Sequence, residues 1–190
     1  MRLMNHPCTI QTRLNNTPIQ KLSNPQNISR FIIGAQEDYV LSRILHLVSL
    51  HDSGMYHYQQ CMEKFMKAFL IEKKISFRQT HILDYLRKKC ADYDRFFNDP
   101  YLIDACEKVT PFEVWGRYPS PSAHSYGWII PDLIYFLDEF VFEMRKKIKR
   151  SGFYDIISEM IHSGKINSLF GVSSSYLVHL FFLDNKYYSK

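Results

Sequence analysis

The apolar residues of this chain recur mainly at helical spacing. In residues 37–50 and 55–73, hydrophobic side chains return every three or four positions, as they do on the buried face of a helix. The same spacing predicts helices that begin after Thr80, that span residues 100–109 and that cover residues 133–148. We therefore predict an all-α fold, a four- to five-helix up-and-down bundle.

Turn-forming residues divide the chain into three parts. Residues 1–35 are rich in Asn, Gln, Thr and Pro and predict an irregular N-terminal lead-in, in which Phe31 to Ile33 could strap the domain. Residues 36–150 predict the helical bundle, interrupted by a non-helical insertion at 111–131 that holds four prolines. Residues 151–190 predict a C-terminal extension whose secondary structure the pattern does not decide.

Polar residues at the expected helix starts suggest caps. The segment from His51 to Gly54 interrupts the helical pattern, and Asp52 or Ser53 could cap the helix that follows. Thr80 is suited to cap the next helix, because its hydroxyl can accept from the free amides of a first turn.

Composition limits the function classes. A chain of 190 residues with 46% hydrophobic residues suits one packed domain, and a net charge of +5 permits nucleic acid as a partner without requiring it. No apolar run approaches the roughly 18 residues of a spanning helix, and no secretory signal is apparent. The four cysteines are scattered, so we expect a reducing, cytoplasmic location, no membrane and no zinc site. They are Cys8, Cys61, Cys90 and Cys106.

Four short motifs occur in a characteristic order. They are Asp38-Tyr39, the helix QQCMEKFMKA at 59–68, Thr80-His81-Ile82-Leu83, and Arg117-Tyr118-Pro119. On these motifs the chain resembles the HEPN family, the higher-eukaryote and prokaryote nucleotide-binding domain, over about residues 38–119 and loosely to 150. The resemblance implies a helical protein without a cofactor that forms a homodimer. It also implies a minimal nucleotidyltransferase as partner, in a toxin–antitoxin-like arrangement.

Four polar residues form a stripe on the second predicted helix, and two interpretations of it stay open. They are Gln60, Glu63, Lys64 and Lys67. The stripe could be a solvated face with a Glu63–Lys67 pair worth about 0.2–0.5 kcal/mol. It could also bind a partner or a nucleotide phosphate, because ammonium groups hold phosphates as point charges.

His81 lies beside the start of the third predicted helix. The partly positive helix N-terminus disfavours a protonated imidazole there. A neutral ring that anchors two helices is therefore the simpler interpretation, and a place in the binding site is the other.

Arg117, His124 and Tyr126 are the candidate catalytic residues. Many HEPN ribonucleases use the pattern R-x4–6-H, in some members followed by x-Tyr, and Arg117 to Tyr126 fits this longer form. An Arg fork can hold a scissile phosphate, and a histidine can transfer protons at neutral pH without a metal. Pro119 and Pro121, however, oppose the helix on which this motif ordinarily lies.

Aromatic residues flank this motif. Trp115, Tyr118 and Trp128 could stack on unpaired bases or could pin a long loop to the bundle. We include Tyr118 among the binding candidates.

The leading functional hypothesis is a HEPN-type module that binds a nucleotide, RNA or a protein partner. The alternative is a metal-independent endoribonuclease that uses Arg117 and His124. An adaptor that assembles through residues beyond 152 is a third possibility.

Overall fold

The fold is described by a computed structural model over residues 25–115, 130–148, 185 and 187. Within these residues the elements are α1 (Pro25–Leu47), α2 (His51–Glu72), α3 (Leu83–Ala91), the 3₁₀ turn η1 (Arg95–Asn98), α4 (Pro100–Val109), α5 (Phe112–Trp115) and α6 (Ile130–Lys147). The described residues contain no strand, and the predicted all-α fold is confirmed.

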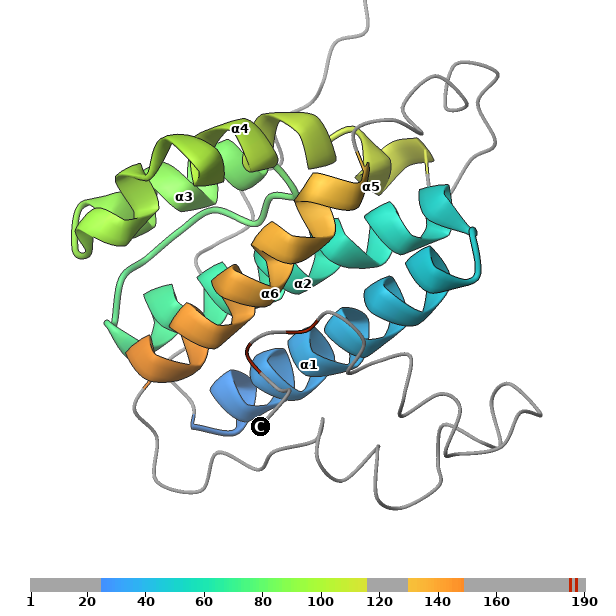
Figure 1. Cartoon of the computed structure of the whole chain (residues 1–190). Helices are drawn as coiled ribbons and strands as arrows, with labels where there is room; N and C mark the ends of the chain where they lie inside the picture. Colours follow the sequence, from blue (N-terminus) through green and yellow to red (C-terminus); the bar gives the residue numbers. More distant parts are fainter. Residues whose placement is uncertain (1–24, 116–129, 149–184, 186, 188–190) are drawn as a thin grey trace, which may run out of the picture.

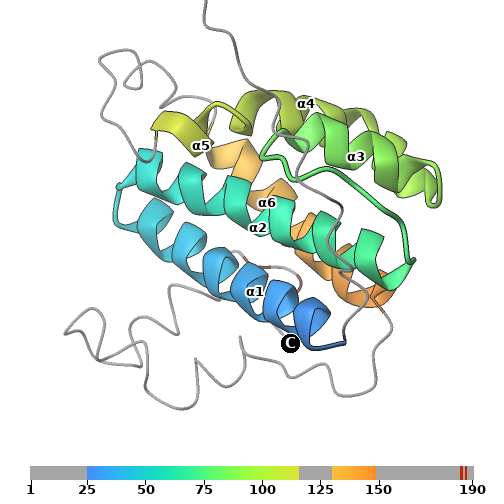
Figure 2. The same cartoon turned by 180° about the vertical axis from the view of Figure 1, so that it is seen from behind.

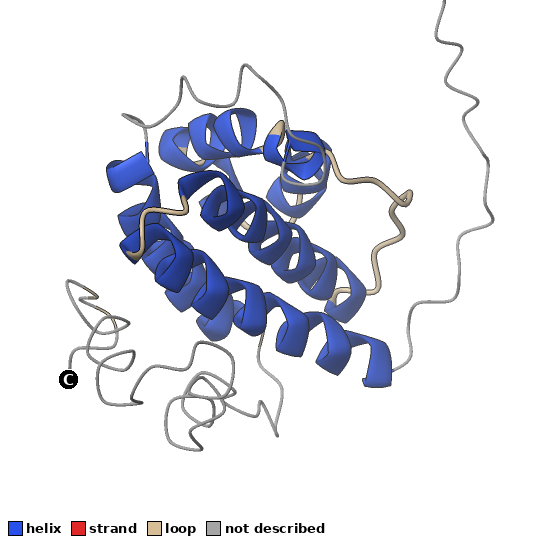
Figure 3. Ribbon diagram, turned by 90° about the vertical axis from the view of Figure 1, so that its right-hand side faces the viewer, coloured by secondary structure: helices blue, strands red, loops and turns tan. Residues whose placement is uncertain are grey.

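Helix α2 is the centre of the bundle. It packs against α1, α3, α4, α5 and α6. Figure 1 shows α1 and α2 side by side and antiparallel, with α6 crossing in front of α2. Helices α3 and α4 form a second antiparallel pair, and the view from behind in Figure 2 shows α2 between this pair and α1. Figure 3 shows the same helices from the side.

The turn between α1 and α2 brings the two helices close together. Ser49 has φ 63°, a left-handed conformation, and the next amide, that of Leu50, donates back to Leu45 O at 2.8 Å. Four residues later, Gly54 lies against α1, where a Cβ atom would stand 3.2 Å from Ser42 O. The glycine therefore permits the close packing of the two helices.

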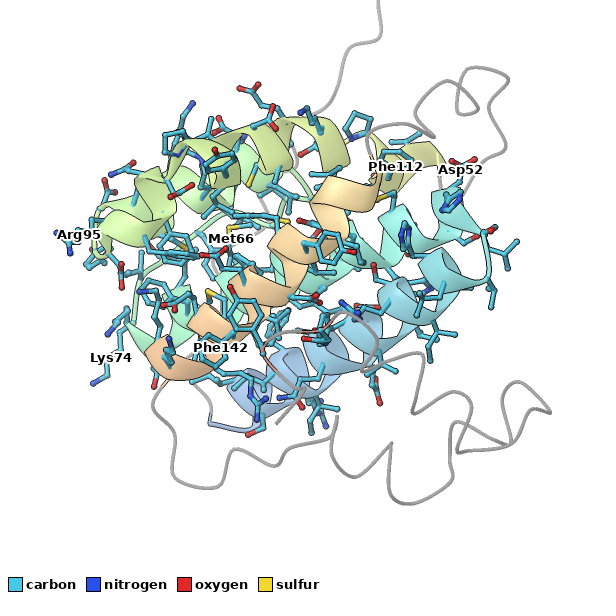
Figure 4. The ribbon with its side chains drawn as sticks, in the orientation of Figure 1. Asp52, Met66, Lys74, Arg95, Phe112 and Phe142 are labelled. Atoms are coloured by element: carbon cyan, nitrogen blue, oxygen red, sulfur yellow. The ribbon has the colours of Figure 1, made fainter. Side chains whose placement is uncertain are left out.

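The hydrophobic core lies around α2, with buried residues from every helix of the described bundle. Phe65 of α2 contacts Phe140 of α6 at 6.3 Å between ring centroids, and Phe69 contacts Phe97 of η1 at 5.0 Å. Figure 4 labels Met66, which is fully buried in the middle of the bundle. Burying one such side chain contributes about 1.5–3 kcal/mol, so this core supplies most of the driving force for the bundle.

Helix α4 has the bounds that the sequence predicts. Its N-cap is Asp99, whose Oδ1 accepts from Tyr101 N at 2.8 Å, and Pro100 occupies the first turn, as we expected.

Helix α1 begins at Pro25, well before the expected start at residue 37. The prediction that the lead-in stays irregular up to residue 35 is therefore wrong for its last part. Ile28 and Ile32 are each 5% exposed and belong to the core. The polar residues around them concealed the buried face of this helical segment.

The expected caps are also wrong. Helix α2 already begins at His51 without a side-chain cap, so the supposed interruption is its first turn, and Asp52 lies within that turn. Helix α3 begins at Leu83, and Thr80 Oγ1 accepts from Ile82 N at 3.1 Å instead of capping α3. Thr80 closes a turn just before the helix.

The expected insertion at 111–131 is partly helical. Phe112 is 2% exposed in α5, and α6 begins at Ile130. Residues 1–24, 116–129 and 149–184 lie outside the described residues. Of the expected C-terminal extension, only Asn185 and Tyr187 are described.

Candidate functional site

The polar stripe of Gln60, Glu63, Lys64 and Lys67 lies on α2, and we call it the α2 stripe. The Glu63 carboxylate is its centre. Its Oε1 accepts from Lys67 Nζ at 2.6 Å, and its Oε2 accepts from Gln59 Nε2 at 3.0 Å. Glu63 is 4% exposed and Lys67 is 8% exposed. The expected i to i+4 pair is therefore present, but Glu63 and Lys67 are not solvated. The reason is that α2 is covered on several sides, so these two residues are buried, whereas Gln60 and Lys64 are half-buried.

His81 joins this network from the segment before α3. Its Nδ1 lies 3.1 Å from Glu63 Oε2 and 4.0 Å from Glu113 Oε1 of α5. A carboxylate can only accept, so Nδ1 carries the proton in the bond to Glu63. The expected link between His81 and a neighbouring helix is present, while 53% of the side chain stays exposed.

Gln59 is a member of this network that the sequence did not single out. Its side chain is fully buried, and its Nε2 donates both to Glu63 Oε2 and to His81 O, each at 3.0 Å. Its Oε1 accepts from Gln60 Nε2 at 2.6 Å. The available signal was the pair Gln59-Gln60, since an amide at the edge of an apolar face needs buried partners.

Lys64 belongs to a separate polar cluster between α1 and α2. Its Nζ donates to Asp38 Oδ2, and Asp38 Oδ1 lies 2.9 Å from His57 Nδ1. Asp38 is 6% exposed. The motif residue Asp38 therefore holds one ammonium and one imidazole in place.

These contacts determine which chemistry the stripe can perform. Both of its ammonium groups are paired with buried carboxylates, and Glu63 has three donors. A phosphate at Lys67 would have to displace a contact whose loss leaves a charge buried, a change that typically costs about 3–5 kcal/mol. The carboxylates of this region hold the side chains of the stripe in fixed positions, and the stripe is not arranged to bind a phosphate.

A further polar cluster lies deeper, between α1, α6 and Asn185. We call Tyr39, Arg43, Asp138 and Asn185 the deep cluster. Asp138 accepts from Tyr39 Oη at 2.7 Å and from Arg43 Nη1. Asn185 Nδ2 donates to Tyr39 Oη at 2.9 Å, and all four residues are at most 3% exposed.

The buried cysteines do not offer a nucleophile. Burial raises the pKa of the Cys61 thiol well above its ordinary value and the pKa of Cys106 to about 12. Burial also raises the pKa of Cys90, whose Sγ lies 3.8 Å from Met66 O. All three are free thiols and stay protonated at neutral pH.

The candidate residues Arg117, Tyr118, His124 and Tyr126 lie outside the described residues. Their role stays a prediction. The structure does describe the element that precedes them: α5 ends at Trp115, two positions before Arg117.

Two further features of the described part of the chain concern metal ions and membranes. No group of three or more His, Cys, Asp or Glu residues there could hold a metal ion. No helix in that part is long and apolar enough to cross a membrane.

Comparison with known proteins shows the family of the chain. A sequence profile of the HEPN domain matches residues 19–140, which is more than half of the chain. The chain belongs to the HEPN family. The HEPN match begins earlier than the motifs suggested, in agreement with the early start of α1.

One relative of this HEPN protein is named "Putative toxin MJ1304" and comes from Methanocaldococcus jannaschii. The two are 32% identical over 97 residues, which cover 48% of this chain and 62% of the relative. The chain thus spans less than two thirds of that relative's length. No solved structure gives a significant match.

Proposed function

We propose that this HEPN protein is a toxin-type binding module that acts through a protein partner, as one half of a toxin–antitoxin-like pair. Its family and the name of its relative support the class. The pairing of both stripe lysines with carboxylates carries the choice of a protein over a phosphate-bearing ligand.

The partner surface that we propose is the exposed edge of the α2 stripe. Ile82 is 49% exposed and Val114 is 54% exposed. Their chain neighbours His81 and Glu113 approach to 4.0 Å, which places residues 82 and 114 in the same region of the molecule. Neutralised charges flanked by exposed apolar residues suit the centre of a protein interface, where unpaired charges are depleted.

The partner that we propose is a minimal nucleotidyltransferase encoded beside this protein, with a homodimer of the chain as the binding unit. The test is titration calorimetry with the purified partner, with ATP and with a short single-stranded RNA. We expect binding of the partner at about micromolar Kd or tighter, and weaker or no binding of ATP and RNA. Binding of ATP or RNA alone would refute the proposal. Sedimentation of the free protein tests the homodimer.

Two variants locate the surface. Ile82→Asp should weaken partner binding by at least about tenfold, since a charge would enter an apolar contact. The substitution should not unfold α3, because residue 82 is its N-cap and Asp is favoured there. The matched control is Tyr93→Asp, at another exposed hydrophobic position, between α3 and η1. Equal losses in both variants would contradict the proposed surface.

A second candidate function is a metal-independent endoribonuclease that uses Arg117, His124 and Tyr126. The observation that favours it is the anchoring of α5, the element just before Arg117, on α2 through the buried Phe112. An anchored element at this point could fix the start of the motif.

The reaction we envisage begins with removal of the 2′-hydroxyl proton of RNA by His124. The resulting oxygen attacks the adjacent phosphorus, and the bond from phosphorus to the 5′-oxygen breaks. The products are a 2′,3′-cyclic phosphate and a 5′-hydroxyl, whose proton comes from a general acid, while Arg117 neutralises the developing charge.

Incubation with labelled RNA in excess EDTA tests this second function. We expect cyclic-phosphate products that disappear in His124→Ala while the circular dichroism spectrum stays helical. RNA that remains intact with the wild-type dimer, or cleavage that survives His124→Ala, would refute it.

A further inference from the structure

A groove lined by residues of η1, α4 and α6 plays no part in these functions. It has a volume of about 220 Å³ and lies between η1, the start of α4 and the middle of α6. We call it the aromatic groove. Its lining residues are Phe96, Asp99, Tyr101, Tyr135, Phe136 and Glu139. Figure 1 shows α4 and α6 on the same face of the bundle.

The groove combines accessible rings with negative charge. Tyr101 is 76% exposed and Tyr135 is 45% exposed, which places two large rings in contact with solvent. Glu139 has no ion pair among the described residues. One oxygen of Asp99 caps α4, and its other oxygen has no hydrogen-bond partner in the described part of the chain. Carboxylates beside aromatic faces attract a cation, because the ring face is itself electronegative.

One cation beside the groove is already engaged. Lys147 Nζ lies 5.0 Å from the centre of the Phe96 ring, but it also donates to Asp94 Oδ2 at 2.8 Å. The lining residues themselves include two carboxylates and no Lys or Arg, on a chain whose net charge is +5.

The size and the charge of the groove together limit the chemical class of its ligand. Pockets for whole small molecules typically measure about 300–1,000 Å³, so a groove of about 220 Å³ suits a single side chain. Its two carboxylates repel phosphate, which excludes a nucleotide or an RNA backbone. A guanidinium fits better than an ammonium, since it is planar, stacks on aromatic rings and forms paired hydrogen bonds with a carboxylate.

We propose that the aromatic groove binds an arginine side chain of a protein partner, stacked on Tyr101 and Tyr135 and paired with Glu139 or Asp99. The proposal rests on the proposed function in one respect only, that the partner is a protein. The groove is a second contact, separate from the edge of the α2 stripe.

The test uses a probe peptide and needs no partner. The full chain labelled with ¹⁵N is titrated with the peptide acetyl-Gly-Ser-Arg-Ser-Gly-amide, and the amide signals of the groove residues are followed. We expect saturable shifts at about 1–10 mM peptide, as for a weak single-residue contact. The same peptide with neutral citrulline in place of arginine should not shift them.

Matched variants identify the groups that bind the probe. Tyr101→Ala should weaken binding of the arginine peptide about two- to fivefold through loss of a cation–π contact. Glu139→Gln should weaken it about two- to tenfold. The controls are Tyr93→Ala, another exposed tyrosine, and Glu107→Gln, an exposed carboxylate of α4; neither residue lines the groove, and neither change should matter.

Three results would overturn the proposal. They are equal binding of the citrulline peptide, losses in the control variants as large as in the groove variants, and groove shifts that follow protein concentration without peptide, which would make a second copy the occupant. Since no partner is used, the groove proposal can fail while Ile82→Asp still weakens partner binding. Equally, the peptide can bind the groove while Ile82→Asp leaves partner binding unchanged.

Discussion

The deep cluster and the α2 stripe both place a buried carboxylate among hydrogen-bond donors, but they connect different parts of the chain. In the deep cluster, Asp138 meets Arg43 and Tyr39 across 95 and 99 positions of sequence. In the stripe, Glu63 meets Lys67 across 4 positions and His81 across 18.

The difference distinguishes a cluster that holds the fold together from one that lies near the surface. The deep cluster fixes α6 against α1 and also holds Asn185, so it can form only when the whole bundle has formed. The contacts of Glu63 in the stripe come from α2 and the segment that follows it, and part of His81 remains at the surface. We infer that the deep cluster serves stability and that the stripe shapes a surface for a partner. The following predictions test this division.

The largest effect should come from Asp138→Ala. It leaves the 3% exposed Arg43 without this carboxylate, and breaking a buried pair costs about 3–5 kcal/mol. Urea unfolding followed by circular dichroism measures the free energy of unfolding. The exposed neighbour Glu139→Ala is the control, with an expected change within about 0.5 kcal/mol. A loss below about 1 kcal/mol for Asp138→Ala would remove the distinction between the two clusters.

Glu63→Ala should have a smaller effect, about 1–3 kcal/mol, because it leaves Lys67 without its carboxylate and Gln59 with only one of its two acceptors, His81 O. Lys67 can turn its ammonium toward water, which limits the loss. A double-mutant cycle with Lys67→Ala checks the contact. We expect the two losses to be less than additive, and strict additivity would mean that the pair is not coupled.

Lys64→Ala should cost less again, about 0.2–1 kcal/mol, since its side chain is 31% exposed and its pair with Asp38 is screened by water. The same unfolding experiment at low and high salt measures it. A loss as large as that of Asp138→Ala would show that burial does not determine how much each ion pair contributes to the free energy of unfolding.

An equally small effect concerns pH and the half-buried pair of Asp94 with Lys147. Burial alone would raise the pKa of Asp94, but hydrogen bonds from Lys147 and from Phe96 N outweigh it and lower the pKa below 3.8. Below pH 3.8 the unfolded chain therefore binds more protons than the native state. The stabilisation is present above pH 3.8 and is lost as the pH falls through the folded pKa.

This pH-dependent contribution should be about 0.2–1 kcal/mol, because the pair is in part exposed to solvent, which screens it. Unfolding curves between pH 3 and 6 should show it in the wild type and should lack it in Asp94→Asn. An unchanged pH dependence in that variant would assign the effect to other carboxylates.

The sequence predicted most where a local signal was sufficient. The bounds of α4 followed from Pro100 and the apolar spacing, and the helix motif of α2 identified the family. Prediction failed at the start of α1, where two isoleucines among polar residues gave too little periodicity. It also failed at Thr80, because which residue caps a helix depends on how the preceding chain approaches it.

By itself, then, the sequence determined the all-α class, the family and the positions of the main helices, because helical periodicity and motif order are properties of neighbouring residues. Only the tertiary structure decided that Glu63 and Lys67 on the polar face of α2 are buried, that Asp38 and Glu63 neutralise the two lysines, and that Asp138 meets Arg43 across the bundle. These contacts join residues brought together by packing, and burial depends on what covers a helix rather than on the helix alone.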